Sequence, residues 1–156
     1  MKKIIISLFL TCFLAAATLS SASAMEGWEA GIKVSSDRAA STLAFGQQPD
    51  ATDLADGLYD VPAMLSGTMQ VYFLNEEDSF WRDIRGMGSY KVWRLVISSQ
   101  TGEPVTLSWN PADLPAESEV KLINEADRQE IDMKDAEEYS LGITPESSLL
   151  IEATNY

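Results

Sequence analysis

Four aspartates at short intervals form the most conspicuous polar feature of the sequence. They are Asp50, Asp53, Asp56 and Asp60, and Asp56 is followed directly by a glycine. Calcium takes roughly six to eight oxygen ligands, which clustered carboxylates and loop carbonyls can supply, but the spacing does not match an EF-hand loop. The alternative is a solvated loop whose aspartates accept hydrogen bonds from its own backbone. The segment is therefore a candidate calcium site or a self-capped loop.

A second candidate site combines aromatic and charged side chains. Phe80 and Trp81 are followed by Arg82, Asp83 and Arg85. We expect the two aromatic rings to be exposed, as part of a loop that binds a protein or a carbohydrate. The alternative is an anchored loop in which the neighbouring charges form local ion pairs.

Two other tryptophans are more typical of a protein core. Trp93 and Trp109 lie in stretches where apolar and polar residues alternate. This period of two places each ring on the apolar face of a strand. We expect both to pack in the interior.

The residue types for nucleophilic and zinc chemistry are missing. The sequence has no histidine and a single cysteine, Cys12, which removes Ser-His-Asp and Cys-His centres and the usual zinc sites. A glycosidase needs only two carboxylates roughly 5–10 Å apart, and the 24 acidic residues make such pairs unavoidable. We predict that the protein is not an enzyme, with a carboxylate-based hydrolase as the alternative.

The N-terminal sequence follows the pattern of a cleavable secretory signal. Met1-Lys2-Lys3 precedes an apolar run over residues 4–17, and small residues lead to Ala22-Ser23-Ala24. The run is shorter than the roughly 20 residues of a membrane-spanning helix. We predict cleavage after Ala24, no membrane span in the remaining chain, and one domain over residues 25–156 that works in the periplasm or outside the cell.

The chain is strongly acidic. Its net charge is −13, and loss of Lys2 and Lys3 with the signal would make it −15. Nucleic acids are bound through lysine and arginine patches, so we predict no nucleic-acid partner. Cys12 would also leave with the signal, and stability must then come from the core alone.

Alternation of apolar and polar residues dominates the rest of the sequence, as it does in half-buried strands. Turn residues separate nine such segments, which are residues 29–35, 41–46, 68–74, 89–99, 104–109, 119–124, 129–133, 139–143 and 148–153. Residues 78–85 are compatible with one helical turn. We predict an all-β fold, a single antiparallel β-sandwich of the Ig-like or jelly-roll type with about nine short strands and little helix.

Several short segments resemble an Ig-like β-sandwich module of bacterial secreted and cell-surface proteins. They are Leu43-Ala44-Phe45-Gly46, Asp50-Ala51-Thr52-Asp53, Tyr59-Asp60-Val61-Pro62, Trp93-Arg94-Leu95-Val96-Ile97 and Val105-Thr106-Leu107-Ser108-Trp109-Asn110. The resemblance covers most of the chain after the signal, and it implies a fold and a surface setting but no chemistry. This chain has only Pro62 where that module carries a run of prolines.

Two functional hypotheses follow. The first is a non-enzymatic module with a structural, adhesive or assembly role at or outside the cell surface. The second is a small carbohydrate- or calcium-binding module that uses the aspartate segment or the Phe80–Trp81 segment.

Overall fold

The computed structural model describes residues 26–143 and 145–155. The predicted signal peptide, its cleavage site and Cys12 lie outside these residues. The described chain is made of strands and turns and contains no α-helix. This confirms the predicted all-β class.

Eleven strands follow one another along the described residues, with one 3-10 turn. They are β1 (Trp28–Ser35), β2 (Ala40–Gln48), β3 (Val61–Pro62), β4 (Met69–Asn75), β5 (Asp78–Gly86), β6 (Tyr90–Ser99), β7 (Val105–Trp109), η1 (Pro111–Asp113), β8 (Ser118–Asn124), β9 (Glu130–Asp132), β10 (Glu138–Leu141) and β11 (Glu146–Asn155). All nine predicted strands are present, with bounds that differ by at most a few residues.

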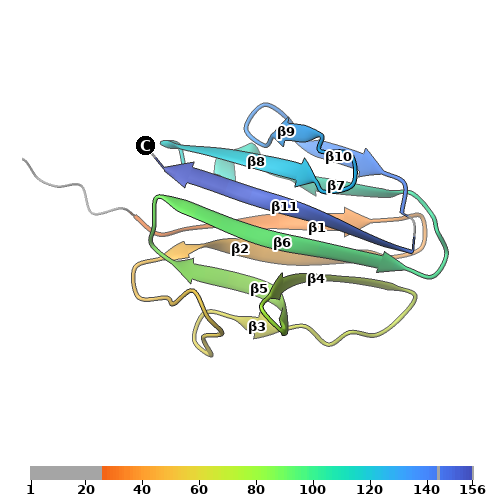
Figure 1. Ribbon diagram of the computed structural model, residues 1–156, viewed down its shortest axis with the longest axis horizontal. Helices are drawn as coiled ribbons and strands as arrows, with labels where there is room; N and C mark the ends of the chain where they lie inside the picture. The colour runs from red at the N-terminus through yellow and green to blue at the C-terminus, as the bar shows by residue number, and fades with distance from the viewer. Residues whose placement is uncertain (1–25, 144, 156) are drawn as a thin grey trace, which may run out of the picture.

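The strands form one continuous sheet. Their order is β10-β7-β1-β2-β5-β4-β6-β11-β8-β9, with β3 attached to β5. Figure 1 shows β6 and β11 passing in front of β1 and β2. The sheet curls into a nearly closed barrel. The finer prediction of a sandwich is not confirmed, because the strands do not separate into two sheets.

The core fills the interior of this barrel with side chains from alternate positions of the strands. Trp93, Phe45 and Phe73 are fully buried, and Trp109 is nearly so. The rings of Trp93 and Phe73 both pack against Phe45. Their centroids lie 5.3 and 5.9 Å from the Phe45 centroid. The prediction that Trp93 and Trp109 belong to the core is confirmed.

Residues 78–85, which are compatible with a helical turn in sequence, are instead the main part of β5. Strand β4 runs into β5 through a tight turn at Glu76 and Glu77, and Glu76 adopts a positive φ of 54°. The segment then pairs with β4, β3 and β2 in turn. The helical alternative is wrong because these three pairings satisfy its backbone groups in an extended conformation.

Candidate functional site

A β-bulge in β5 places two neighbouring side chains on the same face of the sheet. Val61 pairs with Arg82 and Pro62 pairs with Phe80, so Trp81 is an extra residue opposite β3. An extra residue shifts the alternation of inward and outward side chains by one position. Trp81 and Arg82 consequently both line the outer surface.

The bulge also marks the point where β5 parts from β2. The two strands are paired from Ala44 to Gln48 only. Among the described residues, no strand pairs with residues 40–43 on the side of β2 that faces away from β1. The parallel pairing therefore ends in a split between the first half of β2 and the first half of β5.

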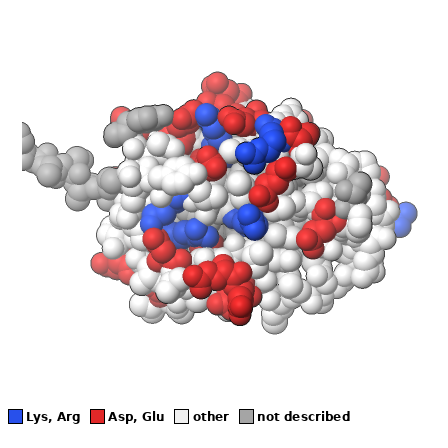
Figure 2. Space-filling view, viewed as in Figure 1, with Lys and Arg blue, Asp and Glu red and all other residues white. Residues whose placement is uncertain are grey.

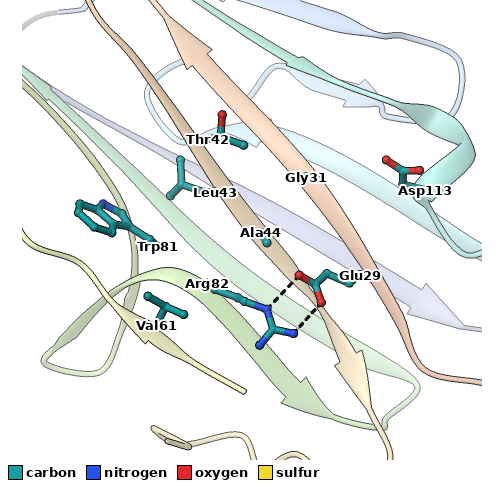
Figure 3. A pocket seen from close by; sticks show the side chains of 9 residues that line it. All are labelled: Glu29, Gly31, Thr42, Leu43, Ala44, Val61, Trp81, Arg82 and Asp113. Carbon is teal, nitrogen blue, oxygen red and sulfur yellow. Dashed lines mark hydrogen bonds and ion pairs between the residues drawn. The ribbon is translucent and has the colours of Figure 1, made fainter. Parts of the chain in front are cut away.

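An open groove of about 580 Å³ lies at this split. Its lining comes from β1, β2, β3, β5 and η1, and the side chains are shown in Figure 3: Glu29, Gly31, Thr42, Leu43, Ala44, Val61, Trp81, Arg82 and Asp113. In this view Trp81 and Val61 lie on one side and the β1 residues on the other, with Arg82 reaching between them. The groove is thus partly apolar and partly charged.

A bidentate ion pair joins β1 to β5 at the floor of the groove. Arg82 Nε and Nη2 donate to the two carboxylate oxygens of Glu29 at 2.9 and 2.7 Å, as drawn in Figure 3. The hydrogen bonds from Arg82 lower the pKa of Glu29, and the same bonds raise the pKa of Arg82. A carboxylate with a lowered pKa is a poor proton donor near neutral pH. Glu29 is therefore suited to holding Arg82 in place and poorly suited to general acid catalysis.

Arg82 also fixes the loop in front of it. Its Nη1 donates to the backbone carbonyl of Tyr59. One guanidinium therefore connects β1, β5 and the long connection between β2 and β4. This arrangement holds the groove wall in a defined position.

The expectation of an exposed aromatic pair is half wrong. Phe80 is 3% exposed and belongs to the core, opposite Phe73 of β4. Only Trp81, which is half-buried, reaches the surface. The cause is the alternation of a strand, in which two adjacent side chains point to opposite faces of the sheet.

Asp83, predicted as part of the same binding loop, is buried, and Arg85 is half-buried beside it. Asp83 is 1% exposed and its carboxylate accepts from Arg85 Nη2 at 2.9 Å. Arg85 also donates to the carbonyl of Val92, and its guanidinium carbon lies 5.6 Å from the ring centroid of Trp93. Trp93 Nε1 donates in turn to the carbonyl of Asp83 at 3.0 Å. This ion pair is fully satisfied within the barrel and is not available to a ligand.

The four aspartates of the candidate calcium site lie in different environments and do not share a set of partners. Asp53 Oδ1 accepts from Lys91 Nζ, and Asp56 Oδ1 accepts from the backbone N–H of Leu58 at 3.0 Å. Asp50 is exposed. Within the described part of the chain, no three acidic side chains form a group that would hold a metal ion. The self-capping alternative is seen directly at Asp56, while calcium binding stays a prediction.

Asp60 anchors the segment to β5. It is 8% exposed, and its two carboxylate oxygens accept from the backbone N–H groups of Asp56 and Ile84 at 2.6 and 2.9 Å. Burial raises the pKa of Asp60, and the two backbone hydrogen bonds oppose that rise. Asp60 therefore links this connection to the barrel through buried hydrogen bonds.

The same connection exposes large apolar side chains. Leu58 is 86% exposed and Met64 is 73% exposed. Leu54, Val61 and Leu65 are also exposed, and we call residues 54–65 the apolar loop. Outside it, Tyr90 is the one large hydrophobic residue of the described chain with comparable exposure. Exposed apolar residues are thus concentrated in one short segment beside the groove.

The apolar loop is held in place at several points along its length. Its backbone is bound at Tyr59 by Arg82 and at Ala63, whose N–H donates to the carbonyl of Ser79 at 2.8 Å. Just before it, Gly86 N–H donates to the carbonyl of Thr52 at 3.2 Å. The exposed side chains are therefore presented by an anchored backbone.

Sequence reasoning identified two of the groove residues and missed the rest. Trp81 and Arg82 were expected in a binding site, and both line the groove. Glu29, Thr42 and Val61 come from distant strands and carry no local signal. The apolar loop did carry one, because its leucines fall among aspartates and glycine without the alternation of a strand.

Comparisons with protein-family models, with curated proteins and with solved structures found no match. Among the described residues, no helix has the length and hydrophobicity that crossing a membrane requires. The resemblance to an Ig-like surface module therefore stays a prediction from sequence.

Proposed function

We propose that the protein is a non-enzymatic extracytoplasmic module that binds a protein partner through the apolar loop and the adjoining groove. The single observation that carries the proposal is the concentration of exposed large hydrophobic residues in residues 54–65. Hydrophobic residues that are exposed singly need no explanation, whereas several on one short segment favour an interaction site. Here they lie on an otherwise acidic chain.

The anchoring of the loop supports this role. A segment that is already ordered loses little conformational freedom when it binds. Asp60, Arg82 and the backbone of β5 hold the loop in the free protein. The molecule therefore presents its apolar side chains in a conformation that is ready for contact.

The setting of the proposal comes from the sequence. The N-terminal pattern of a secretory signal and the resemblance to Ig-like modules of bacterial surface proteins support a structural, adhesive or assembly role outside the cytoplasm. The lack of histidine in the sequence supports a role without nucleophilic or zinc catalysis.

Cross-linking in native periplasmic and culture fractions tests this function. The double variant Leu58→Ser/Met64→Ser should lose the cross-linked product that the wild type forms. Both side chains are largely exposed, so we expect stability to stay within about 0.5 kcal/mol of the wild type. Tyr90→Ser is the matched control, because Tyr90 is exposed outside the loop, and it should cross-link normally. A partnerless wild type, or an unaffected double variant, would contradict the proposal.

A carbohydrate is a second candidate ligand for the groove. The specific observation is the half-buried Trp81 beside Glu29, Arg82, Thr42 and Asp113, an aromatic surface next to groups that hydrogen-bond to hydroxyls. A glycan array would test it, with Trp81→Ala as the variant. Binding that requires Trp81 would support a carbohydrate site. If the wild type binds no glycan on the array, this candidate is excluded.

A further inference from the structure

We propose that the groove receives an extended segment of a cationic partner protein, which adds a strand to the free edge of β2 at residues 40–43. This inference rests on the proposed function, since it names the mode of binding and the charge of the partner. Strand addition to an open sheet edge is a recurrent mode of peptide recognition, in which backbone hydrogen bonds supply affinity and pockets for alternate side chains supply specificity.

The free edge follows from the register of β1 and β2. The backbone N–H of Ser36 donates to the carbonyl of Ala39 at 2.8 Å, so this pair is of the hydrogen-bonded kind. Because such pairs alternate in an antiparallel ladder, residues 41 and 43 bond to β1. Ala40 and Thr42 then direct their backbone groups away from β1, towards the split where β5 is not paired. Thr42 thus offers a donor and an acceptor to an incoming strand.

The walls of the groove suit an extended segment. Val61 and Trp81 form the wall opposite Thr42, as Figure 3 shows. A strand laid along β2 would turn alternate side chains towards this wall. Val61 belongs both to this wall and to the apolar loop.

The charge of the molecule selects a cationic partner. All 24 acidic residues lie in the described chain, together with nine lysines and arginines. Six of these nine are already in ion pairs with acidic side chains: Arg38, Arg82, Arg85, Lys91, Arg94 and Lys121. On the face shown in Figure 2, acidic side chains form several patches and basic ones lie close to them. The excess negative charge steers cationic partners towards the molecule.

The same charge disfavours a second copy of this chain as the occupant. Two molecules of net charge −13 repel one another. The free edge is also short, at residues 40–43, and a pair of such edges would bring two acidic barrels into contact. A partner of opposite charge avoids this cost.

A phage-displayed library of linear dodecapeptides, selected on the full wild-type chain, provides the probe. We expect enriched peptides with net positive charge, and the strongest binder would be synthesised for titration. In its complex with the wild type, the amide of Thr42 should become protected from hydrogen exchange. This measurement needs no variant, so it stays valid if a substitution fails to fold.

Thr42→Pro and Thr42→Val form the matched pair of variants. Proline removes the outward N–H, and it is tolerated on edge strands where that N–H faces solvent. Valine keeps the N–H and the β-branched shape. We expect Thr42→Pro to weaken binding of the selected peptide by about tenfold or more, the equivalent of one or two lost backbone hydrogen bonds. Thr42→Val should bind within about twofold of the wild type.

Four outcomes would overturn the inference: a library that yields no enriched peptide, enriched peptides that are acidic, equal binding by Thr42→Pro, or a wild type that sediments as a dimer through this edge. The variant Leu58→Ser/Met64→Ser separates this inference from the proposed function. If only that variant loses its native partner and Thr42→Pro binds normally, partner binding stands and strand addition fails.

Discussion

At the scale of single residues, two carboxylates beside the groove are held in opposite environments. Glu29 is partly exposed and faces a guanidinium, so its pKa is lowered. Asp60 is buried, so its pKa is raised despite two backbone donors. The two residues therefore have opposite effects on the pH dependence of stability, and each can be tested separately.

Replacing Glu29 by glutamine should weaken the link between β1 and β5. At pH 7 we expect unfolding free energy to fall by about 0.5–1 kcal/mol, since the pair is partly exposed to solvent. A lowered pKa stabilises the fold above the unfolded pKa, and this contribution is lost as the pH falls through the folded value. The difference between Glu29→Gln and wild type should therefore shrink in urea titrations as the pH falls below the unfolded value of about 4.3. Glu26→Gln, at an exposed position, is the control for removal of a charge, and an equal effect there would refute the assignment.

Removing the buried carboxylate of Asp60 should lower the free energy of unfolding by more. Asp60→Ala leaves the N–H of Ile84 without its acceptor in the interior, and we expect a loss of about 1–3 kcal/mol. Asp50→Ala, at an exposed carboxylate, should be nearly neutral. Thermal denaturation of the two variants decides the matter. Equal melting temperatures for both variants would show that the hydrogen bonds to Asp60 do not stabilise the fold.

The raised pKa of Asp60 gives a pH dependence with the opposite sign. Its stabilising contribution is fully present below the unfolded pKa and is lost as the pH rises through the folded value. Asp60→Asn cannot titrate, so its stability deficit relative to wild type should be larger at pH 3 than at pH 7. A deficit that grows with pH would contradict this reading of the site.

At the scale of elements, the bulge in β5 lies at the groove. If Trp81 were deleted, Phe80 would stay inward, Arg82 outward and Asp83 inward in a regular strand. The register with Val61 and Pro62 would also become continuous. The groove lies where β5 changes from pairing with β4 to pairing with β2.

The elements show why the sequence predicted nine strands and not β5. The nine follow the simple alternation that one buried face imposes. In β5 the bulge interrupts that alternation, and Ile84 is fully buried as well as the adjacent Asp83. The site was predictable only where its residues were adjacent, at Trp81 and Arg82, because pairing between distant strands brings in Glu29 and Thr42.

At the scale of the whole molecule, barrel closure and charge dominate. Alternation identifies strands but does not say whether they form two sheets or one, because that depends on pairings between distant parts of the chain such as β2 with β5. The charge was predictable, and most of the basic residues are engaged in ion pairs with part of the larger acidic set. The remaining acids repel one another across the surface.

Salt should therefore stabilise the protein. Self-repulsion weakens the compact state of a highly charged chain, and salt screens it with a Debye length of about 10 Å at 0.1 M. In calorimetry, we expect the melting temperature to rise as the NaCl concentration is increased from about 10 to about 500 mM. A falling melting temperature would show that ion pairs outweigh the repulsion.

The same measurement tests calcium. At ionic strength matched to NaCl, a bound ion adds stability that depends on its concentration. If CaCl₂ raises the melting temperature above both NaCl and MgCl₂, and Asp53→Asn removes the increment, the calcium prediction is supported. If the melting temperature rises equally in all three salts, the calcium prediction is wrong.

The split beside β2 also has a consequence for solubility. The sheet otherwise ends in β9 and β10, strands of three and four residues in an acidic part of the chain, and short, charged edges resist aggregation. The open edge at residues 40–43 lies beside exposed apolar side chains and lacks that protection within the described chain. A molecule without its partner would then begin to aggregate at the same edge that strand addition uses. Shelf life in concentrated solution would depend on whether that edge is covered.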